Sequence, residues 1–271
     1  RLTAFTFANF FASASGTCAS YNNGDPVALS DQVSGRGIIT DFAWSDIQHG
    51  PYYECIAVSK TADPVSGGWW LYTFRADDAS HAWLNDYPKL GLWRDGIYMS
   101  SNLFDCLDAL CNSANYDGVR VWALNRDDMI SGAALRSVSF ILGTSYYSLL
   151  PANVKGDLPP ANTPEYFVSD SYPISGNTIT SMNMWKFTTN WTTPSSSTLT
   201  GPTTISVASF TLALNNVPQK GSTEAVDTLG ARLVTWLQYR NIGGTESLWA
   251  SHTVVAGSST AVRWMEVRGM S

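Results

Sequence analysis

Short strand-type runs separated by turn residues cover most of this chain, and they constrain its fold more than any other feature. Runs rich in Val, Ile, Tyr, Phe, Trp and Thr alternate with clusters of Gly, Pro, Asn and Asp. This pattern is typical of antiparallel strands joined by tight turns. The best candidate for a helix is the short stretch 126–135. The sequence therefore predicts an all-β protein.

The runs fall into four similar groups, each with up to four consecutive strands and the last with three. The groups are residues 26–75, 88–142, 146–210 and 232–268. Turn pairs stand at matching places between the first and second strands of three groups, as Ser34-Gly35, Asp95-Gly96 and Gly243-Gly244. Propellers repeat four-stranded antiparallel sheets around an axis. We expect one β-propeller domain over residues 1–271; a β-sandwich, or a pair of them, is the alternative.

The fourth group lacks a last strand, which has two explanations. Residues 2–11 could supply that strand and close the ring, or the chain could be a fragment of a larger ring. We favour the fragment, because the strand grouping ends abruptly at Ser271.

The four cysteines are Cys18, Cys55, Cys106 and Cys111. An even number in a chain with few charges suggests two disulfides formed in an oxidising compartment. Cys106 and Cys111 are near enough in sequence for a local bridge, which would leave Cys18 to pair with Cys55, although four cysteines allow three connectivities. Four free thiols are the alternative, and zinc is disfavoured because there is no Cys-x-x-Cys pair.

Charged residues are scarce: they make up 14% of the chain, against an ordinary level of roughly 25%. Aromatic residues reach 13% and the net charge is −6. Nucleic acid is not an expected partner, because binding phosphates requires clustered Lys and Arg. No apolar run of about 18 residues is present, so we expect no membrane insertion. Low charge with many aromatics is typical of a secreted, extracellular β-protein.

Several stretches resemble a family of secreted β-propeller-like proteins of largely unassigned function. They are residues 23–27 (NGDPV), 52–61 (YYECIAVSKT), 85–91 (NDYPKLG), 246–254 (ESLWASHTV) and 262–264 (VRW). The resemblance spans most of the chain and implies a propeller fold, secretion and a chain that continues past residue 268. It implies no particular activity.

Carboxylates near the starts of strands are the candidates for catalysis. Asp25 and Asp86 each precede the first strand of a group and are expected at equivalent positions around the axis. With Glu54 or Glu246 they could form the acid and base pair of a glycosidase. The alternative, which we favour, is that both aspartates cap turns through backbone amides. The sequence contains no Gly-x-Ser-x-Gly and no His-Glu-x-x-His motif.

Tryptophans are the candidates for sugar binding, because their flat rings have both apolar faces and a polar edge. We expect Trp83, Trp93 and Trp191 to be the ligand-binding rings, while most tryptophans pack between sheets. His252 shares a strand face with Ala250 and Val254, which predicts a packed side chain rather than a catalytic base.

No cofactor is indicated, and the metal ligands are unknown. The run Asn125, Asp127, Asp128 could hold Ca²⁺, but a solvated turn is the preferred interpretation. We therefore expect a secreted or cell-surface module that binds glycan or protein, or acts in extracellular assembly, without catalysis. The alternative is a glycan-active hydrolase or lyase with its carboxylates at the mouth of the propeller.

Overall fold

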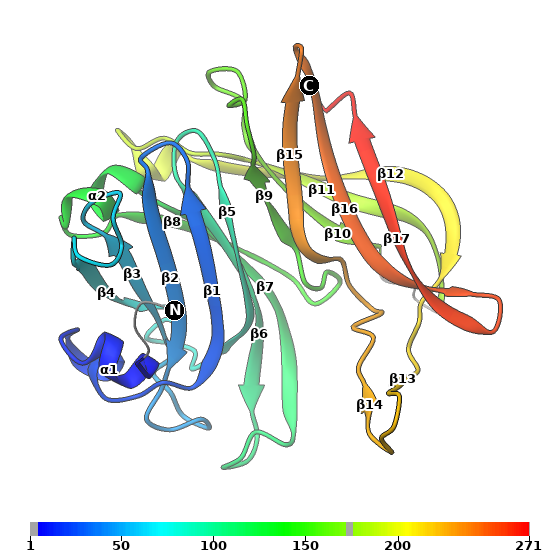
Figure 1. The fold of residues 1–271 in the computed structure, drawn as a ribbon, viewed down its shortest axis with the longest axis horizontal. Coiled ribbons are helices and arrows are strands. Elements are labelled where there is room, and N and C mark those ends of the chain that lie inside the picture. The colour runs from blue at the N-terminus through cyan, green and yellow to red at the C-terminus, as the bar shows by residue number, and fades with distance from the viewer. Residues whose placement is uncertain (1–4, 172–175, 271) are drawn as a thin grey trace. The chain divides into compact units, whose positions relative to one another are not determined.

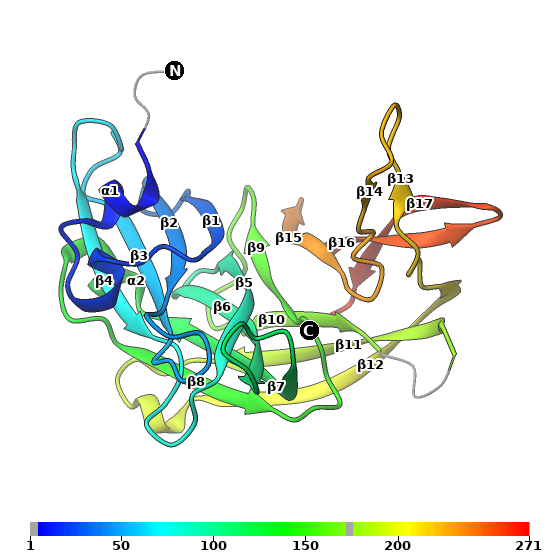
Figure 2. The same cartoon turned by 90° about the horizontal axis from the view of Figure 1, so that it is seen from below.

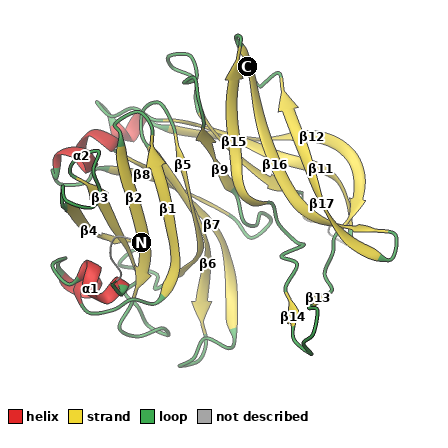
Figure 3. Cartoon of the chain, in the orientation of Figure 1, coloured by secondary structure: helices red, strands yellow, loops and turns green. Residues whose placement is uncertain are grey.

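The structure is a computed structural model that describes residues 5–171 and 176–270. Strands dominate it, as predicted, and helices are short (Figures 1 and 3). The chain divides into two compact units, residues 1–144 and 145–271. Each unit has its own hydrogen-bonded β-sheets, in which antiparallel pairing predominates.

The first unit contains two four-stranded antiparallel sheets, each in simple sequence order. The strands of the first sheet are β1 (Gly24–Asp31), β2 (Arg36–Ala43), β3 (Tyr53–Ser59) and β4 (Trp69–Arg75). The strands of the second are β5 (Leu84–Leu92), β6 (Ile97–Cys106), β7 (Ala114–Leu124) and β8 (Ser137–Leu142). These strands coincide with the first two predicted groups, so the grouping by turns is confirmed here.

One continuous apolar core joins the facing sides of these two sheets. Alternate residues along each strand supply it, because side chains in a strand point to opposite faces in turn. Its fully or nearly buried members from the strands are Leu29, Ile38, Ile56, Val58, Leu90, Leu92, Ile97, Met99, Trp122 and Leu124. The helix α2 (Arg126–Ser131) adds Met129 to this core and lies where the sequence predicted its best helix.

The N-terminal segment covers the opposite face of the first sheet (Figure 2). It contains α1 (Phe7–Phe11) and the 3₁₀ helix η1 (Gly16–Ala19). The Cys18–Cys55 disulfide fixes this segment to β3, and Phe10 packs edge-on against Trp69 at 5.1 Å. Both predicted disulfides are present, the second being Cys106–Cys111. The idea that residues 2–11 form a ring-closing strand is wrong for the described part, which is helical at Phe7–Phe11.

The first strands of the two sheets carry the same irregularity. In β1 and β5 one extra residue bulges out of the ladder with the second strand. The bulge holds Asp25 in one strand and Tyr87 in the other, at φ values of 47° and 57°, and a proline follows each. Proline is compatible with these positions because both strands lie at the edge of their sheets. The two sheets are therefore structural repeats of one another.

The second unit contains one seven-stranded sheet in the order β12-β11-β10-β9-β15-β16-β17. Its strands are β9 (Leu150–Val154), β10 (Glu165–Asp170), β11 (Thr178–Thr188), β12 (Thr198–Thr211), β15 (Val234–Ile242), β16 (Thr245–Ala256) and β17 (Ser259–Arg268). The short 3₁₀ helix η2 (Pro194–Ser196) and the two-residue strands β13 (Val217–Pro218) and β14 (Ala225–Val226) lie in its connections.

Two groups of antiparallel strands merge in this sheet through a short parallel ladder. β9 pairs with β15 over three residues, from Ala152 opposite Leu237 to Val154 opposite Tyr239. The sheet also curls, so that Leu212, beyond β12, bridges to Val254 of β16. The predicted first strand of the third group, residues 146–150, is wrong in position, because β9 begins at Leu150.

Candidate functional site

Glu54 in the first unit is a buried carboxyl group with a strongly raised pKa. It projects from β3 into the space between the two sheets and is fully buried. Asn85 of β5 donates its side-chain amide to the Glu54 Oε2 at 3.0 Å. Burial raises the pKa of Glu54 from 4.5 to about 8, and the charges of Asp41 and Asp25 act in the same direction. Burial therefore favours the protonated form and keeps the group from solvent, which suits a structural role.

The two aspartates expected at equivalent positions are not equivalent. The matching bulges place Asp25 opposite Tyr87 in the repeat, whereas Asp86 corresponds to Gly24. Asp25 is exposed and Asp86 half-buried. Asp25 directly precedes Pro26, whereas Asp86 is two residues before Pro88. Because one residue in a strand reverses the direction of the side chain, this offset makes the two positions different.

Glu246 lies in the other unit, on β16. It accepts a hydrogen bond from the Tyr239 hydroxyl at 2.5 Å. Burial raises the pKa of the nearby Tyr166 to about 12, with the charge of Glu246 adding to the effect. None of Asp25, Glu54, Asp86 and Glu246 lines either of the two pockets described below. The four candidates are therefore divided between the units, with three in the first and one in the second.

The three predicted ligand-binding tryptophans are largely occupied by contacts within the protein. Trp93 is fully buried, so its expected role in binding is not met: its ring is enclosed beside the turn between β5 and β6. Trp83 is half-buried and stacks on the His81 ring, with 4.2 Å between centroids. Trp191 is half-buried in the loop before η2.

The run considered for Ca²⁺ forms the start of α2. The Asn125 side chain accepts a hydrogen bond from the Asp128 backbone at 2.9 Å, which caps the helix. Asp128 is also bound by Arg136, which lowers the pKa of its carboxyl group. Within the described ranges, no group of three or more His, Cys, Asp or Glu side chains is placed to hold a metal ion.

An exposed aromatic surface lies on the outer face of β15, β16 and β17. Trp236, Trp249 and Trp264 each come from a different one of these adjacent strands. Trp264 is 68% exposed and Trp236 38%, and the Trp249 and Trp264 rings lie 5.4 Å apart at a tilt of 31°. The opposite face carries the buried residues Leu248 and His252. We call the three rings the tryptophan face.

A pocket of about 220 Å³ adjoins Trp236. It lies across the parallel β9–β15 ladder and just beyond it, where Gln238 stands opposite Asn153. Its lining consists of Asn153, Lys155, Trp236, Gln238 and Arg240. The Lys155 ammonium lies 6.0 Å from the centroid of the Trp236 ring, within the range of a cation–π contact. We call this the cationic pocket.

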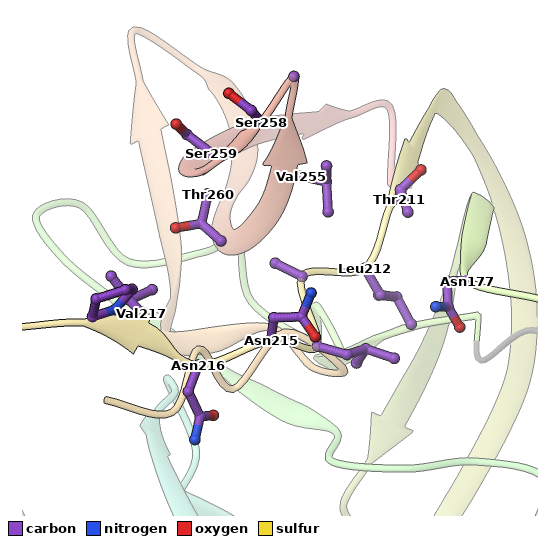
Figure 4. A pocket seen from close by; sticks show the side chains of 14 residues that line it. Asn177, Thr211, Leu212, Asn215, Asn216, Val217, Val255, Ser258, Ser259 and Thr260 are labelled. Carbon is purple, nitrogen blue, oxygen red and sulfur yellow. The ribbon is translucent and has the colours of Figure 1, made fainter. Parts of the chain in front are cut away.

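A second, larger pocket of about 650 Å³ opens between the segment after β12 and the turn joining β16 to β17 (Figure 4). Its lining has no charged and no aromatic side chain. Asn215 and Leu212 come from the segment after β12, while Val255 and Ser259 flank the β16–β17 turn. This pocket therefore offers uncharged hydrogen-bonding groups beside aliphatic ones.

The tryptophan face was not predicted from the sequence, although the alternation of residues along β16 contained a signal for it. His252 was placed on one face of its strand with Ala250 and Val254, and all three are buried there as predicted. The alternate residues of the same strand, Trp249 and Ser251, therefore had to face outward, together with Trp264 of the next strand. What the alternation could not indicate is that this outward face stays uncovered.

Comparisons with known proteins add no assignment to this geometry. Within the described residues, no helix has the length and apolar character needed to cross a bilayer. Neither a scan against models of protein families nor a search of curated proteins finds a match to this chain.

Proposed function

We propose that this protein is an extracellular glycan-binding module and that it binds its ligand on the tryptophan face. The observation that carries this proposal is the presence of three tryptophans on one face of three adjacent strands, one of them 68% exposed. Contiguous apolar patches exposed to water are uncommon on a folded protein unless they serve recognition. The apolar C–H faces of a sugar ring fit against an indole, whose N–H also stays available for a hydrogen bond.

The spacing of the rings suits an extended ligand. Neighbouring strands lie about 4.8 Å apart, so rings on β15, β16 and β17 span about 10 Å across the sheet. Polar side chains stand among them, including Gln238 on β15 and Ser251 and Thr253 on β16. Amide and hydroxyl groups both donate and accept hydrogen bonds, as sugar hydroxyls require.

Two disulfides support an extracellular location. Cys18–Cys55 and Cys106–Cys111 account for all four cysteines. Such bonds form and persist in oxidising compartments and are rare in the cytosol. The resemblance to secreted propeller-like proteins favours the same location.

We infer that the four strand groups are blades of one propeller domain. The matching bulges of β1 and β5 support this, as does the face-to-face packing of the sheets that contain them. The first strands of the third and fourth groups, β9 and β15, also run parallel, as first strands of successive blades do; their joining into one seven-stranded sheet departs from the separate sheets of propeller blades. A crystal structure should place all four first strands parallel around one axis; two separate sandwiches would overturn the inference.

A glycan array tests the proposed function. The protein should bind glycans, and Trp264→Ala and Trp236→Ala should each weaken binding by about tenfold or more, the loss expected for roughly 1.4 kcal/mol of stacking. Leu110→Ala is a matched control, because Leu110 is 75% exposed but lies in the first unit. Binding that both tryptophan variants retain in full would contradict the proposed surface.

A reducing-sugar release assay tests the alternative of a glycan-active enzyme. Binding without release is the expected result, because Glu54 is fully buried and Glu246 lies in a different unit from Asp25 and Asp86. Release that Asp86→Asn abolishes would instead establish a hydrolase.

A further inference from the structure

We propose that the cationic pocket selects an anionic sugar, one that carries a carboxylate or a sulfate, as the anchoring unit of the bound glycan. This inference rests on the proposed function, because the pocket adjoins the tryptophan face through Trp236. It adds the chemical class of the ligand, which the three rings alone do not specify.

The lining of the pocket has a positive charge that nothing in it neutralises. Lys155 and Arg240 both line it, and the other lining residues are the uncharged Asn153, Trp236 and Gln238. The whole chain is acidic, with 22 Asp and Glu against 16 Lys and Arg. Two cations gathered without an acid in such a protein are therefore a local departure from its overall charge.

Neither cation takes part in an ion pair with any of the described residues, whereas five arginines of this protein do. The arginines that pair with a carboxylate are Arg75, Arg120, Arg126, Arg136 and Arg268. Glu266 on β17, which stands opposite Trp249, is engaged by Arg268 at 2.7 Å. Lys155 and Arg240 are also half-buried, so each has lost part of its hydration. A bound anion would offset that loss.

The geometry of these groups suits the oxyanion of a sugar. A guanidinium presents two parallel N–H donors that match a carboxylate or a sulfate, while an ammonium acts as a compact point charge. Gln238 can reach a ring hydroxyl with its amide, and the Trp236 indole supplies the apolar contact. A volume of about 220 Å³ is below the usual range for drug-sized ligands, roughly 300–1,000 Å³. The pocket therefore fits one sugar unit, and the remaining units would extend over Trp249 and Trp264.

Calorimetric titration with four oligosaccharides of the same length, two charged and each with a neutral partner, tests this inference. The probes are an oligogalacturonate, its fully methyl-esterified form, which keeps the ring but removes the charge, and a sulfated neutral oligosaccharide with its unsulfated parent. At low salt the wild-type protein should bind one charged form about tenfold more tightly than its neutral partner, as expected for one charge-assisted hydrogen-bonded pair. The acid and sulfate arms distinguish the two sources of charge.

The salt dependence of binding tests the inference without any variant. The preference for the charged form should shrink as the salt concentration rises from about 0.02 M to 0.5 M, because the pocket is open to solvent and its charges are screened. Binding of the neutral form should change little over the same range.

Variants then assign the effect to the pocket. Arg240→Gln and Lys155→Gln should each reduce the preference at least severalfold, while Lys220→Gln, which removes one exposed charge from the β13–β14 hairpin, should preserve it. Equal affinity for charged and neutral forms, or a preference that survives in both pocket variants, overturns the inference. Tryptophan-dependent binding without that preference leaves the proposed function standing, whereas a failure to bind any glycan refutes the proposed function itself.

Discussion

Similar strand groups associate in different ways in the two units of this protein. In the first unit, two complete four-stranded sheets pack face to face; Trp93 and Trp122 are buried, and none of the described tryptophans there is exposed. In the second unit, the corresponding groups join edge to edge through the β9–β15 ladder, and Trp236 and Trp264 remain exposed. Composition alone does not separate the two cases. The difference teaches that the way sheets associate decides which aromatic residues are free for recognition.

The units also differ in how they accommodate a buried carboxyl group. In the first unit the partner of Glu54 is an uncharged amide from Asn85, and burial favours the protonated acid. In the second unit Asp170 lies on β10 opposite His252 of β16, with 3.5 Å between Oδ2 and Nδ1. Both side chains are almost completely buried, and the His252 ring also meets Phe210 edge-on at 4.2 Å.

The largest expected effect concerns Glu54 and pH. Its folded pKa of about 8 lies above its ordinary value of 4.5, so its contribution to stability is complete below pH 4.5 and is lost as the pH rises through about 8. The change amounts to about 5 kcal/mol over that range. Asp41, whose pKa burial raises to about 7, acts in the same direction. Unfolding of the first unit should therefore require less denaturant at pH 9 than at pH 5.

Glu54→Gln isolates this contribution, because a glutamine can still accept the hydrogen bond from Asn85 but cannot ionise. The variant should match the wild type at pH 5 and exceed its stability at pH 9. Hydrogen exchange read separately for the two units provides the measurement. A wild-type first unit with the same stability at both pH values would show that Glu54 is not held protonated.

The second prediction concerns the disulfides of the first unit. Cys18–Cys55 spans 37 residues and Cys106–Cys111 only 5. Loop entropy predicts a stability loss of about 4 kcal/mol when the long bridge is removed by double alanine substitution, and about 2 kcal/mol for the short one. Chemical denaturation measures both losses. Hydrogen exchange should rise in the N-terminal segment with α1 and η1 only when the long bridge is absent.

The third prediction concerns the buried pair of Asp170 and His252 in the second unit. Asp170→Asn removes the charge opposite His252 while keeping the side-chain volume, and we expect a loss of about 3 kcal/mol confined to the second unit. Asp157→Asn, at an exposed position of the same unit, is the control. Unchanged hydrogen exchange in β10 and β16 would mean that the pair contributes nothing to stability.

The smallest expected effect tests the comparison of tryptophans directly. Trp264→Ala should change the stability by less than about 1 kcal/mol, since its exposed ring loses only the contact with Trp249. The same substitution at Trp122, which is 2% exposed, should cost about 3–5 kcal/mol. Thermal unfolding gives both values. A large loss at Trp264 would indicate that its ring packs against something other than Trp249.

Much of the secondary structure could be predicted from local sequence, and the exceptions have physical causes. The first two strand groups and the α2 helix lie where the turn residues placed them. α1 was missed because an apolar run such as residues 5–11 fits a strand or a helix equally well. Its helical start is fixed by the Thr6 side chain, which accepts a hydrogen bond from the Asn9 backbone at 3.2 Å. The strand at 146–150 was misplaced because Tyr146 instead packs on Trp185.

The candidate site was less predictable than the fold. Glu54 could be named from the sequence, but its burial depends on Asn85, which is 31 residues away. The cationic pocket unites Lys155 of the β9 end with Arg240 of β15, and only the parallel pairing of those strands brings them together. Such pairing is set by contacts between distant segments, which a local pattern does not encode.

The sequence by itself determined the all-β class, the division into strand groups and the inward face of the strand that carries His252, and it predicted the local Cys106–Cys111 bridge. These features depend on nearest neighbours, on turn chemistry and on a period of two residues. The tertiary structure alone decided which carboxyl groups are buried and which tryptophans remain exposed to solvent. The physical reason is that alternation assigns each side chain to a face of its sheet, whereas burial of that face depends on whether another layer of the chain covers it.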